Sequence, residues 1–289
     1  QQSKQLVSMT DHRKFWEKKK VEIDAEELFT AGVYDFYLLL FDYHNRYYEK
    51  CREHSVLKAV SPEPPLIDSA DFFFSDQVRS ILSDALGDIT SLIEKHNEGL
   101  DFSVLRGNVS GKMCTPEDLI RPLLQHDMEK VAAVAGEQKL GVEEFIFLVV
   151  NWMKPFFVAA AEACADSYDD EDWQENYCPL CGSYPDMAEI VDKLEGKRYL
   201  HCSLCEHRWM YVRISCTVCG NNDMQSIGYF TASEAEERYR IDYCDKCKGY
   251  IKTLRIPKLY DSSSFDMVIE NIMTAYLDSA AMEKGYFRP

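Results

Sequence analysis

The sequence predicts an α+β protein, in which an N-terminal helical domain is followed by two small four-cysteine modules and a C-terminal helix. Apolar residues recur at helical spacing up to about residue 170, whereas short segments rich in aromatic and β-branched residues take over from Tyr177. Eight of the eleven cysteines form four Cys-x-x-Cys pairs in this second part. The acidic segment 169–175 separates the two parts, so we expect domains at 1–170, 171–213 and 214–289.

Four helices are expected in the N-terminal part. Residues 30–51 form one, and residues 143–165, which are nearly apolar all round, form the central helix of a bundle. A third carries an apolar stripe at i, i+3 and i+4; Ser75 is expected to cap it and Gly99 to end it. A fourth opens at Thr115, followed by proline and two acids.

The C-terminal part has a different periodicity. Short runs of aromatic and β-branched residues predict strands, and each cysteine pair lies at a turn between or beside them. A final helix is expected from an apolar face that repeats at helical spacing over residues 262–282. The expected strands span residues 198–201, 208–214, 227–231, 238–243 and 249–254.

Composition narrows the class of protein. The net charge of −17 argues against a nucleic-acid or anionic-membrane binder, because phosphate binding needs an excess of Lys and Arg. The longest apolar run, 145–161, is interrupted by Asn151, Lys154 and Pro155, so a buried helix explains it better than a membrane span. No secretory signal is visible in the sequence. Together with the cysteine pattern, this predicts a reducing compartment.

The four cysteine pairs predict two metal sites. Two thiolates from one tight turn occupy adjacent corners of a tetrahedron, and a second turn about twenty residues away fills the other two. Sequential pairing, first with second and third with fourth, is favoured over a cross-braced arrangement because strands separate the members of each proposed site. Gly182 and Gly220 follow two of the pairs and would permit a positive φ there. The eight predicted ligands are Cys178, Cys181, Cys202, Cys205, Cys216, Cys219, Cys244 and Cys247.

Two metal ions, Zn²⁺ or iron, suit four-thiolate sites of this zinc-ribbon or rubredoxin-like type. A structural role is favoured because all four ligands are protein thiolates, whereas catalytic zinc normally keeps a position open. A dithiol oxidoreductase fits less well, since such enzymes place one Cys-x-x-Cys at a helix start. No catalytic motif is evident, so we expect no enzyme. The remaining cysteines, Cys51, Cys114 and Cys164, read as buried small hydrophobes.

Basic and aromatic residues alternate near the cysteines. His201 and His207 flank the second pair, and they read as strand or loop surface residues rather than ligands. Aromatic residues beside arginine are typical of protein-binding surfaces and also of single-stranded nucleic-acid platforms, while a solvated strand face is the plainer interpretation. The predicted partner-binding residues are Arg198, Tyr199, Trp209, Tyr211 and Arg213.

The cysteine-bearing region resembles the formate dehydrogenase accessory protein family, FdhE. The resemblance covers residues 173–252 and includes all eight cysteines in order. Its motifs are Trp173, Cys178-Pro-Leu-Cys181-Gly-Ser183, Pro185, Arg198-Tyr-Leu-His-Cys202-Ser-Leu-Cys205, Trp209, Val212-Arg213, Cys216-x-x-Cys219, Tyr243-Cys244-Asp-x-Cys247 and Gly249-Tyr-Ile-Lys252.

This resemblance implies a cytoplasmic maturation factor without enzymatic activity. Such a factor binds the catalytic subunit of a molybdenum- or tungsten-containing formate dehydrogenase and assists its assembly, and the eight cysteines would hold iron or zinc. A homodimer is plausible by base rate, and no nucleic-acid or membrane partner is expected. Two alternatives stay open from the residues alone: a metal-ribbon protein that binds nucleic acid, and a rubredoxin-like redox participant.

Overall fold

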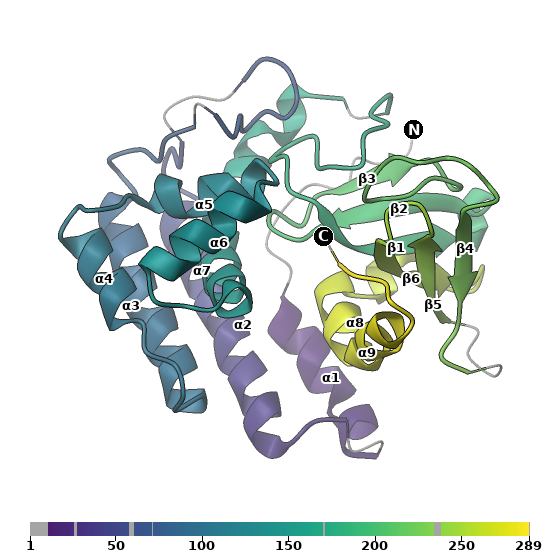
Figure 1. Ribbon diagram of the computed structural model, residues 1–289, viewed down its shortest axis with the longest axis horizontal. Coiled ribbons are helices and arrows are strands. Elements are labelled where there is room, and N and C mark those ends of the chain that lie inside the picture. Colours follow the sequence, from purple (N-terminus) through teal and green to yellow (C-terminus); the bar gives the residue numbers. More distant parts are fainter. Residues whose placement is uncertain are drawn as a thin grey trace. The chain divides into compact units, whose positions relative to one another are not determined.

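The computed structural model describes residues 11–25, 28–57, 61–70, 72–169, 171–233 and 238–288 (Figure 1). The chain divides into two compact units. The first comprises Gln1–Ser167 with Leu180–Ser183, and the second comprises Tyr168–Pro179 with Tyr184–Pro289. The predicted α+β class, with helices first and a cysteine-bearing sheet second, is confirmed. The division of the second part at 213/214 stays a proposal.

The first unit is a helical bundle. The helices expected over 30–51 and 143–165 are present as α2 and α7, and α5 begins directly after Thr115. The helices α1, α4 and α6 were not predicted. They bury few side chains: three in α1, one in α4 and two in α6. The elements are α1 (His12–Ala25), α2 (Ala31–Cys51), α3 (Arg79–His96), α4 (Ser103–Ser110), α5 (Pro116–Leu124), α6 (Met128–Glu137), α7 (Val142–Cys164) and the 3₁₀ turn η1 (Ala165–Ser167).

The helix α7 forms the centre of the bundle and continues through Pro155. The indole of Trp152 donates a hydrogen bond to Leu82 O at 3.0 Å, and the hydroxyl of Tyr43 donates to Trp152 O at 3.3 Å. These bonds connect α7 to α3 and α2. Among the described residues, α7 is the one helix long and apolar enough to cross a membrane, but 72% of its apolar window is buried inside the protein. Such burial is typical of a core helix, as the sequence predicted.

Two helix starts differ in how well the sequence anticipated them. Thr115 forms the expected cap: its Oγ1 accepts a hydrogen bond from Asp118 N at 3.2 Å, and its own N–H donates to Asp118 Oδ2 at 2.8 Å. The predicted Ser75 cap is wrong. The helix α3 begins at Arg79, and the Ser75 hydroxyl donates to Ser55 O instead. The same helix ends at His96, before Gly99.

Replacing Thr115 by alanine should lower the free energy of unfolding by about 1 kcal/mol, because the N–H of Asp118 loses its acceptor, Thr115 Oγ1, whereas the bond from the backbone N–H of residue 115 to Asp118 remains. Thermal or urea unfolding of the full chain measures this loss. Ser91→Ala is the matched control, since that exposed hydroxyl bonds only to Gly87 O within α3. Equal effects of the two substitutions would contradict the capping role.

The second unit contains one six-stranded sheet in the order β3-β2-β1-β6-β5-β4. The strands β1 and β6 pair in parallel, and every other neighbouring pair is antiparallel. All five predicted strands are present, but the central strand β1 was not predicted. The strands are β1 (Pro185–Val191), β2 (Lys197–Cys202), β3 (Arg208–Tyr211), β4 (Ile227–Phe230), β5 (Tyr239–Cys244) and β6 (Tyr250–Ile256).

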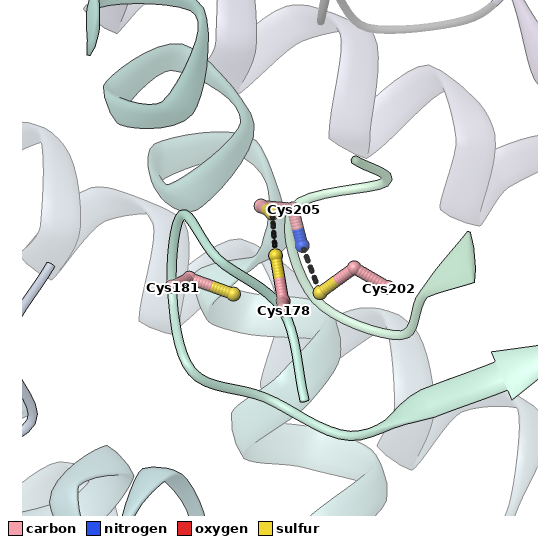
Figure 2. A group of neighbouring side chains, drawn as sticks. All are labelled: Cys178, Cys181, Cys202 and Cys205. Carbon is pink, nitrogen blue, oxygen red and sulfur yellow. Dashed lines mark hydrogen bonds between the residues drawn. The ribbon is translucent and has the colours of Figure 1, made fainter. Parts of the chain in front are cut away.

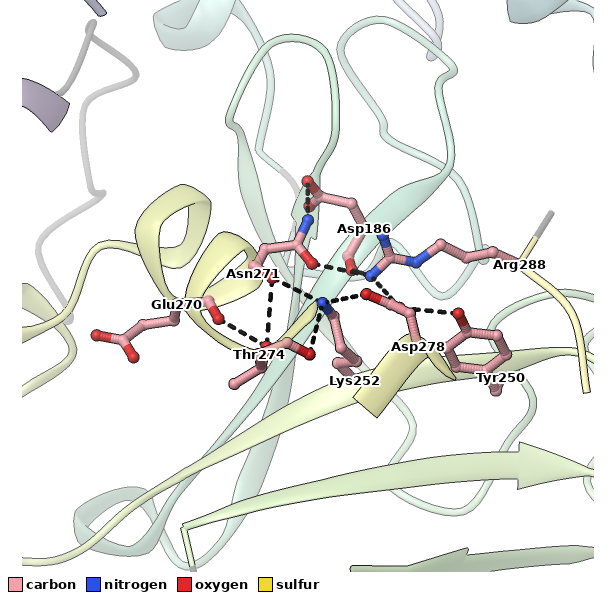
Figure 3. A network of polar contacts seen from close by, with 8 residues as sticks. All are labelled: Asp186, Tyr250, Lys252, Glu270, Asn271, Thr274, Asp278 and Arg288. Atoms are coloured by element: carbon pink, nitrogen blue, oxygen red, sulfur yellow. Dashed lines mark hydrogen bonds and ion pairs between the residues drawn. The ribbon is translucent and has the colours of Figure 1, made fainter. Parts of the chain in front are cut away.

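The predicted C-terminal helix over 262–282 is corrected to a 3₁₀ turn, η3 (Ser262–Ser264), and two helices, α8 (Met267–Met273) and α9 (Ala275–Glu283). The break has a physical reason in the buried Lys252 of β6. Its ammonium donates to Asn271 O at 2.7 Å and to Thr274 O at 3.3 Å, so it binds the carbonyl groups where α8 ends (Figure 3). Its charge is paired with Asp278 at 2.7 Å.

Lys252 should make stability depend on pH. Burial, together with the nearby charge of Arg288, lowers the pKa of Lys252 from 10.5 to about 8. The folded chain therefore binds fewer protons than the unfolded chain between pH 8 and 10.5, and the free energy of unfolding should rise with pH in this window. A shift of this size contributes about 3 kcal/mol.

The measurement is the difference in unfolding free energy between the parent chain and Lys252→Met at several pH values. The variant should lack the rise, whereas Lys258→Met, at an exposed position, should retain it. A parallel pH profile for the parent and Lys252→Met would contradict the assignment.

Candidate metal centre

The first cysteine group joins two turns. One turn carries Cys178 and Cys181 before β1, and the other begins with Cys202, the last residue of β2, and carries Cys205. The four sulfur atoms lie within 4.8 Å of one another and all four side chains are buried (Figure 2). Two backbone N–H groups, of Leu204 and Cys205, donate to Cys202 Sγ at 3.4 Å each. Such donors favour the thiolate form that a metal ion binds.

The second group repeats this arrangement with Cys216, Cys219, Cys244 and Cys247. The N–H groups of Val218 and Cys219 donate to Cys216 Sγ at 3.3 and 3.5 Å. The N–H of Gly249 donates to Cys247 Sγ at 3.3 Å. The groups therefore combine the first pair with the second and the third with the fourth, so sequential pairing is confirmed and the cross-braced alternative is wrong.

All four turns share one backbone feature. The residue after each second cysteine has a positive φ: 76° at Gly182, 61° at Glu206, 67° at Gly220 and 61° at Lys248. The two glycines were expected. Glu206 and Lys248 adopt the same left-handed conformation without the freedom of glycine. In three turns a further hydrogen bond closes the loop from the first cysteine N–H to the carbonyl five residues later, at 2.8–3.0 Å.

The donor set fits a metal ion. Cys178 Sγ lies 3.6 Å from Cys205 Sγ, and Cys216 Sγ lies 3.6 Å from Cys247 Sγ. A tetrahedral site with metal–sulfur bonds of roughly 2.3 Å separates its sulfurs by about 3.8 Å, whereas a disulfide holds them about 2.05 Å apart. All eleven cysteines are free thiols. Each group could therefore bind one metal ion through protein sulfur alone.

The two groups differ in solvent access. The first is buried at all four positions, whereas in the second Cys219 is exposed and Cys247 is partly exposed. Burial raises the pKa of Cys216 well above its ordinary value. At Cys244 burial acts in the same direction, but hydrogen bonds from backbone N–H groups outweigh it and lower the pKa. The second group is thus the one that solvent can reach.

The predicted partner-binding residues occupy mostly interior positions. Tyr199 packs in a core cluster with Met187 and Leu254, and the indole of Trp209 donates to Glu175 O at 3.2 Å. Arg198 and Tyr211 are buried as well, and Arg213 alone of the five is exposed. Four of the five side chains are therefore buried in the unit. A partner surface at these residues stays a prediction.

The histidines also differ from a simple surface placement. His207 is buried, with its ring stacked on Trp209 at 6.4 Å between centroids, and His201 is partly buried near Glu189. Neither belongs to a cysteine group. Of the three scattered cysteines, Cys51 and Cys164 are buried as expected, whereas Cys114 is partly exposed.

One important residue was missed, the fully buried Glu189 of β1. Its carboxylate pairs with Arg208 and accepts a hydrogen bond from Ser262 Oγ at 3.1 Å. Burial alone would raise the pKa of Glu189, but His201 and Arg208 outweigh burial and lower the pKa to about 2. A single acidic residue in a strand that was not predicted gives no sign in the sequence that it is buried and paired.

The first four-cysteine group coincides with a known domain. Residues 177–213 match the family model described as the central domain of FdhE. The predicted resemblance to FdhE is confirmed. The matched FdhE segment begins just before Cys178 and contains all four cysteines of the first group.

Individual relatives agree with this match. The chain is 42% identical over 114 residues to an FdhE homolog of Shewanella oneidensis, covering 39% of this chain and 36% of the relative. It is 35% identical over 144 residues to an FdhE homolog of Aquifex aeolicus, covering 49% of each. It is 31% identical over 116 residues to FdhE of Escherichia coli, covering 40% and 36%. The chain thus spans less than half the length of these relatives.

A solved structure shares the fold. The crystal structure of the FdhE protein from Pseudomonas aeruginosa matches with a TM-score of 0.51 at 18% identity, covering 88% of this chain and 86% of that one. This likeness extends to the helical N-terminal part, for which no sequence motif had been found.

Proposed function

We propose that this chain is a maturation factor that binds the catalytic subunit of a molybdenum- or tungsten-containing formate dehydrogenase and assists its assembly. The observation that supports it most is the coincidence of the matched FdhE central domain with the buried four-cysteine group. The arrangement suits a binding protein, because four protein thiolates saturate a metal ion and leave no position for substrate. The proposal includes a cytoplasmic location and no catalytic activity.

The test has a binding arm and a cellular arm. The metal-loaded chain should capture the immature catalytic subunit from an extract of the same organism, and deletion of its gene should lower formate dehydrogenase activity. Cys202→Ser should lose both effects, whereas Cys114→Ser, outside the two groups, should retain them. Absence of capture together with full activity in the deletion strain would reject the proposal.

We further propose that the eight cysteines bind two metal ions, zinc or iron, with a structural role. A redox role for iron is the second candidate, and the exposure of Cys219 favours it for the second group alone. Metal analysis after anaerobic purification separates the two candidates. Zinc in both groups, unchanged by an oxidant, would exclude the redox role. Iron in the second group, with a reversible change of its visible spectrum, would support it.

The nucleic-acid alternative has less support. Arg198, one of its proposed contact residues, is buried and bonded to Ser215 O at 3.0 Å. The chain as a whole carries a net charge of −17, which repels a phosphate backbone.

A further inference from the structure

A cavity of about 270 Å³ lies within the second unit, beside the second cysteine group. On β5, Ile241 packs against Leu277 of α9. Because side chains alternate along a strand, Arg240 and Asp242 point to the opposite face, which borders the cavity. Cys216 and the residues next to it form another part of the wall. The cavity is therefore on the sheet face away from α9.

The charge of this cavity is opposite to that of the chain. Its charged lining residues are Arg198, Arg213, Arg240 and Asp242, so three positive groups face one negative group, a net of +2. The whole chain carries −17. A local excess of positive charge inside a concave, partly apolar wall attracts an anion.

The most buried of these arginines lacks a partner for one donor. Arg198 is 3% exposed; its two Nη atoms contact Ser215 O at 3.0 Å and Asp242 Oδ2 at 3.4 Å. Its Nε–H has no hydrogen-bond partner among the residues that the structure describes. Buried donors are nearly always bonded, so an open donor of a charged group in the wall of a cavity points to a bound acceptor.

The rim of the cavity is apolar and exposed. Ile214, Met224 and Tyr229 are 46%, 71% and 63% exposed. The guanidinium of Arg240 lies 4.5 Å from the centre of the Tyr229 ring, which holds this arginine at the edge. Exposed aromatic, methionine and arginine side chains of this kind are typical of protein interfaces.

We propose that this cavity binds the carboxylate of an Asp or Glu side chain carried by an apolar segment of a partner protein. The arginines would receive the carboxylate, and the rim would contact the flanking apolar residues. A free anion suits the cavity less well. With a divalent ion bound, the four thiolates of the second cysteine group would keep a net negative charge beside the cavity, at Cys216. The arginines alone would therefore bind an anion weakly, and apolar contacts at the rim must add to the affinity.

The test uses the full metal-loaded chain and a synthetic probe, acetyl-Leu-Glu-Leu-amide, in place of the unidentified partner. Methyl NMR signals of Ile214 and Met224 should shift on titration. The corresponding Gln peptide should bind at least about ten-fold more weakly, because it lacks the charge-assisted hydrogen bonds. Arg240→Gln should weaken binding of the Glu peptide by a similar factor.

The matched control is Arg255→Gln. Arg255 is an exposed arginine of β6 that pairs with Asp192 and does not line the cavity. This substitution should leave the affinity for the Glu peptide unchanged within about two-fold. Equal binding of the Glu and Gln peptides would overturn the proposal, as would equal losses in the two arginine variants. Binding of inorganic phosphate as tight as that of the Glu peptide would also overturn it, since it would indicate a site for free anions.

As a client contact, this site rests on the proposed maturation role. The two proposals nevertheless fail separately. Peptide titration involves no formate dehydrogenase subunit. If the chain captured the subunit but did not bind the peptide, the proposed function would stand and the proposed carboxylate site would be rejected.

Discussion

A chelator is expected to remove metal from the second cysteine group well before the first. Cys219 is exposed and Cys247 partly exposed, so a chelator can reach the second group in the folded chain. The first group is buried at every position, and its metal can leave only after local unfolding. Metal release followed with a colorimetric chelator should therefore show two phases of equal amplitude and different rate.

The slow phase should coincide with unfolding of the second unit. Thiolate binding of a structural metal contributes on the order of 10 kcal/mol to folding, which exceeds the net stability of most small domains. Circular dichroism recorded in parallel should change little during the fast phase and strongly during the slow one. Cys202→Ser should remove the slow phase and unfold the sheet without chelator. Cys219→Ser should remove the fast phase and leave most of the sheet intact.

A single release rate for both metals would contradict the difference in access between the two groups. Loss of sheet signal during the fast phase would show that the exposed group is equally necessary for folding. Cys51→Ala, a buried cysteine outside both groups, serves as the control, because it should alter neither phase.

Replacing Glu189 by leucine should destabilise the second unit by about 3–5 kcal/mol, because Arg208 then loses its buried partner. The hydroxyl of Ser262 loses its acceptor as well. Urea unfolding of the metal-loaded chain measures this loss. Arg255→Leu is the control, since it breaks only the ion pair of the exposed Arg255 of β6 with Asp192 and should cost less than about 1 kcal/mol.

Glu189 also predicts the acid sensitivity of the chain. Its pKa is about 2 in the folded state and 4.5 ordinarily, so the unfolded chain binds the extra proton between these values. The stabilisation, about 3 kcal/mol, is therefore complete above pH 4.5 and lost as the pH falls toward 2. Glu189→Gln should flatten this part of the pH profile. An unchanged profile would show that other carboxylates cause the acid unfolding.

The features that were predicted best are those set by residues close together in the sequence. The spacing of the cysteine pairs was enough for both groups, because each ligand turn is a closed four-residue motif. The capping box at Thr115 was readable for the same reason. The strand β1 was not predictable, since the acids Asp186 and Glu189 interrupt its apolar pattern. The partner that pairs with the buried charge of Glu189, Arg208, lies nineteen residues away in the sequence.

The partner residues show the other limit of sequence reasoning. A run that alternates arginine and aromatic residues reads the same whether its aromatic face is buried or exposed. The structure buries Tyr199 and Trp209 and leaves Arg213 outside. The burial of Tyr199 comes from a core cluster that includes Met187 of β1, and β1 was not predicted.

The parallel pairing of β1 with β6 has a consequence during synthesis of the chain. Val191 pairs with Ile256, so the ribosome must make 65 further residues after β1 before the sheet can close. Until then β1 is an edge strand with open backbone groups, although its antiparallel partner β2 follows at once. The nascent chain therefore passes through a stage prone to aggregation. All four cysteines of the first group are made before β6, so this group can bind a metal ion before that stage ends.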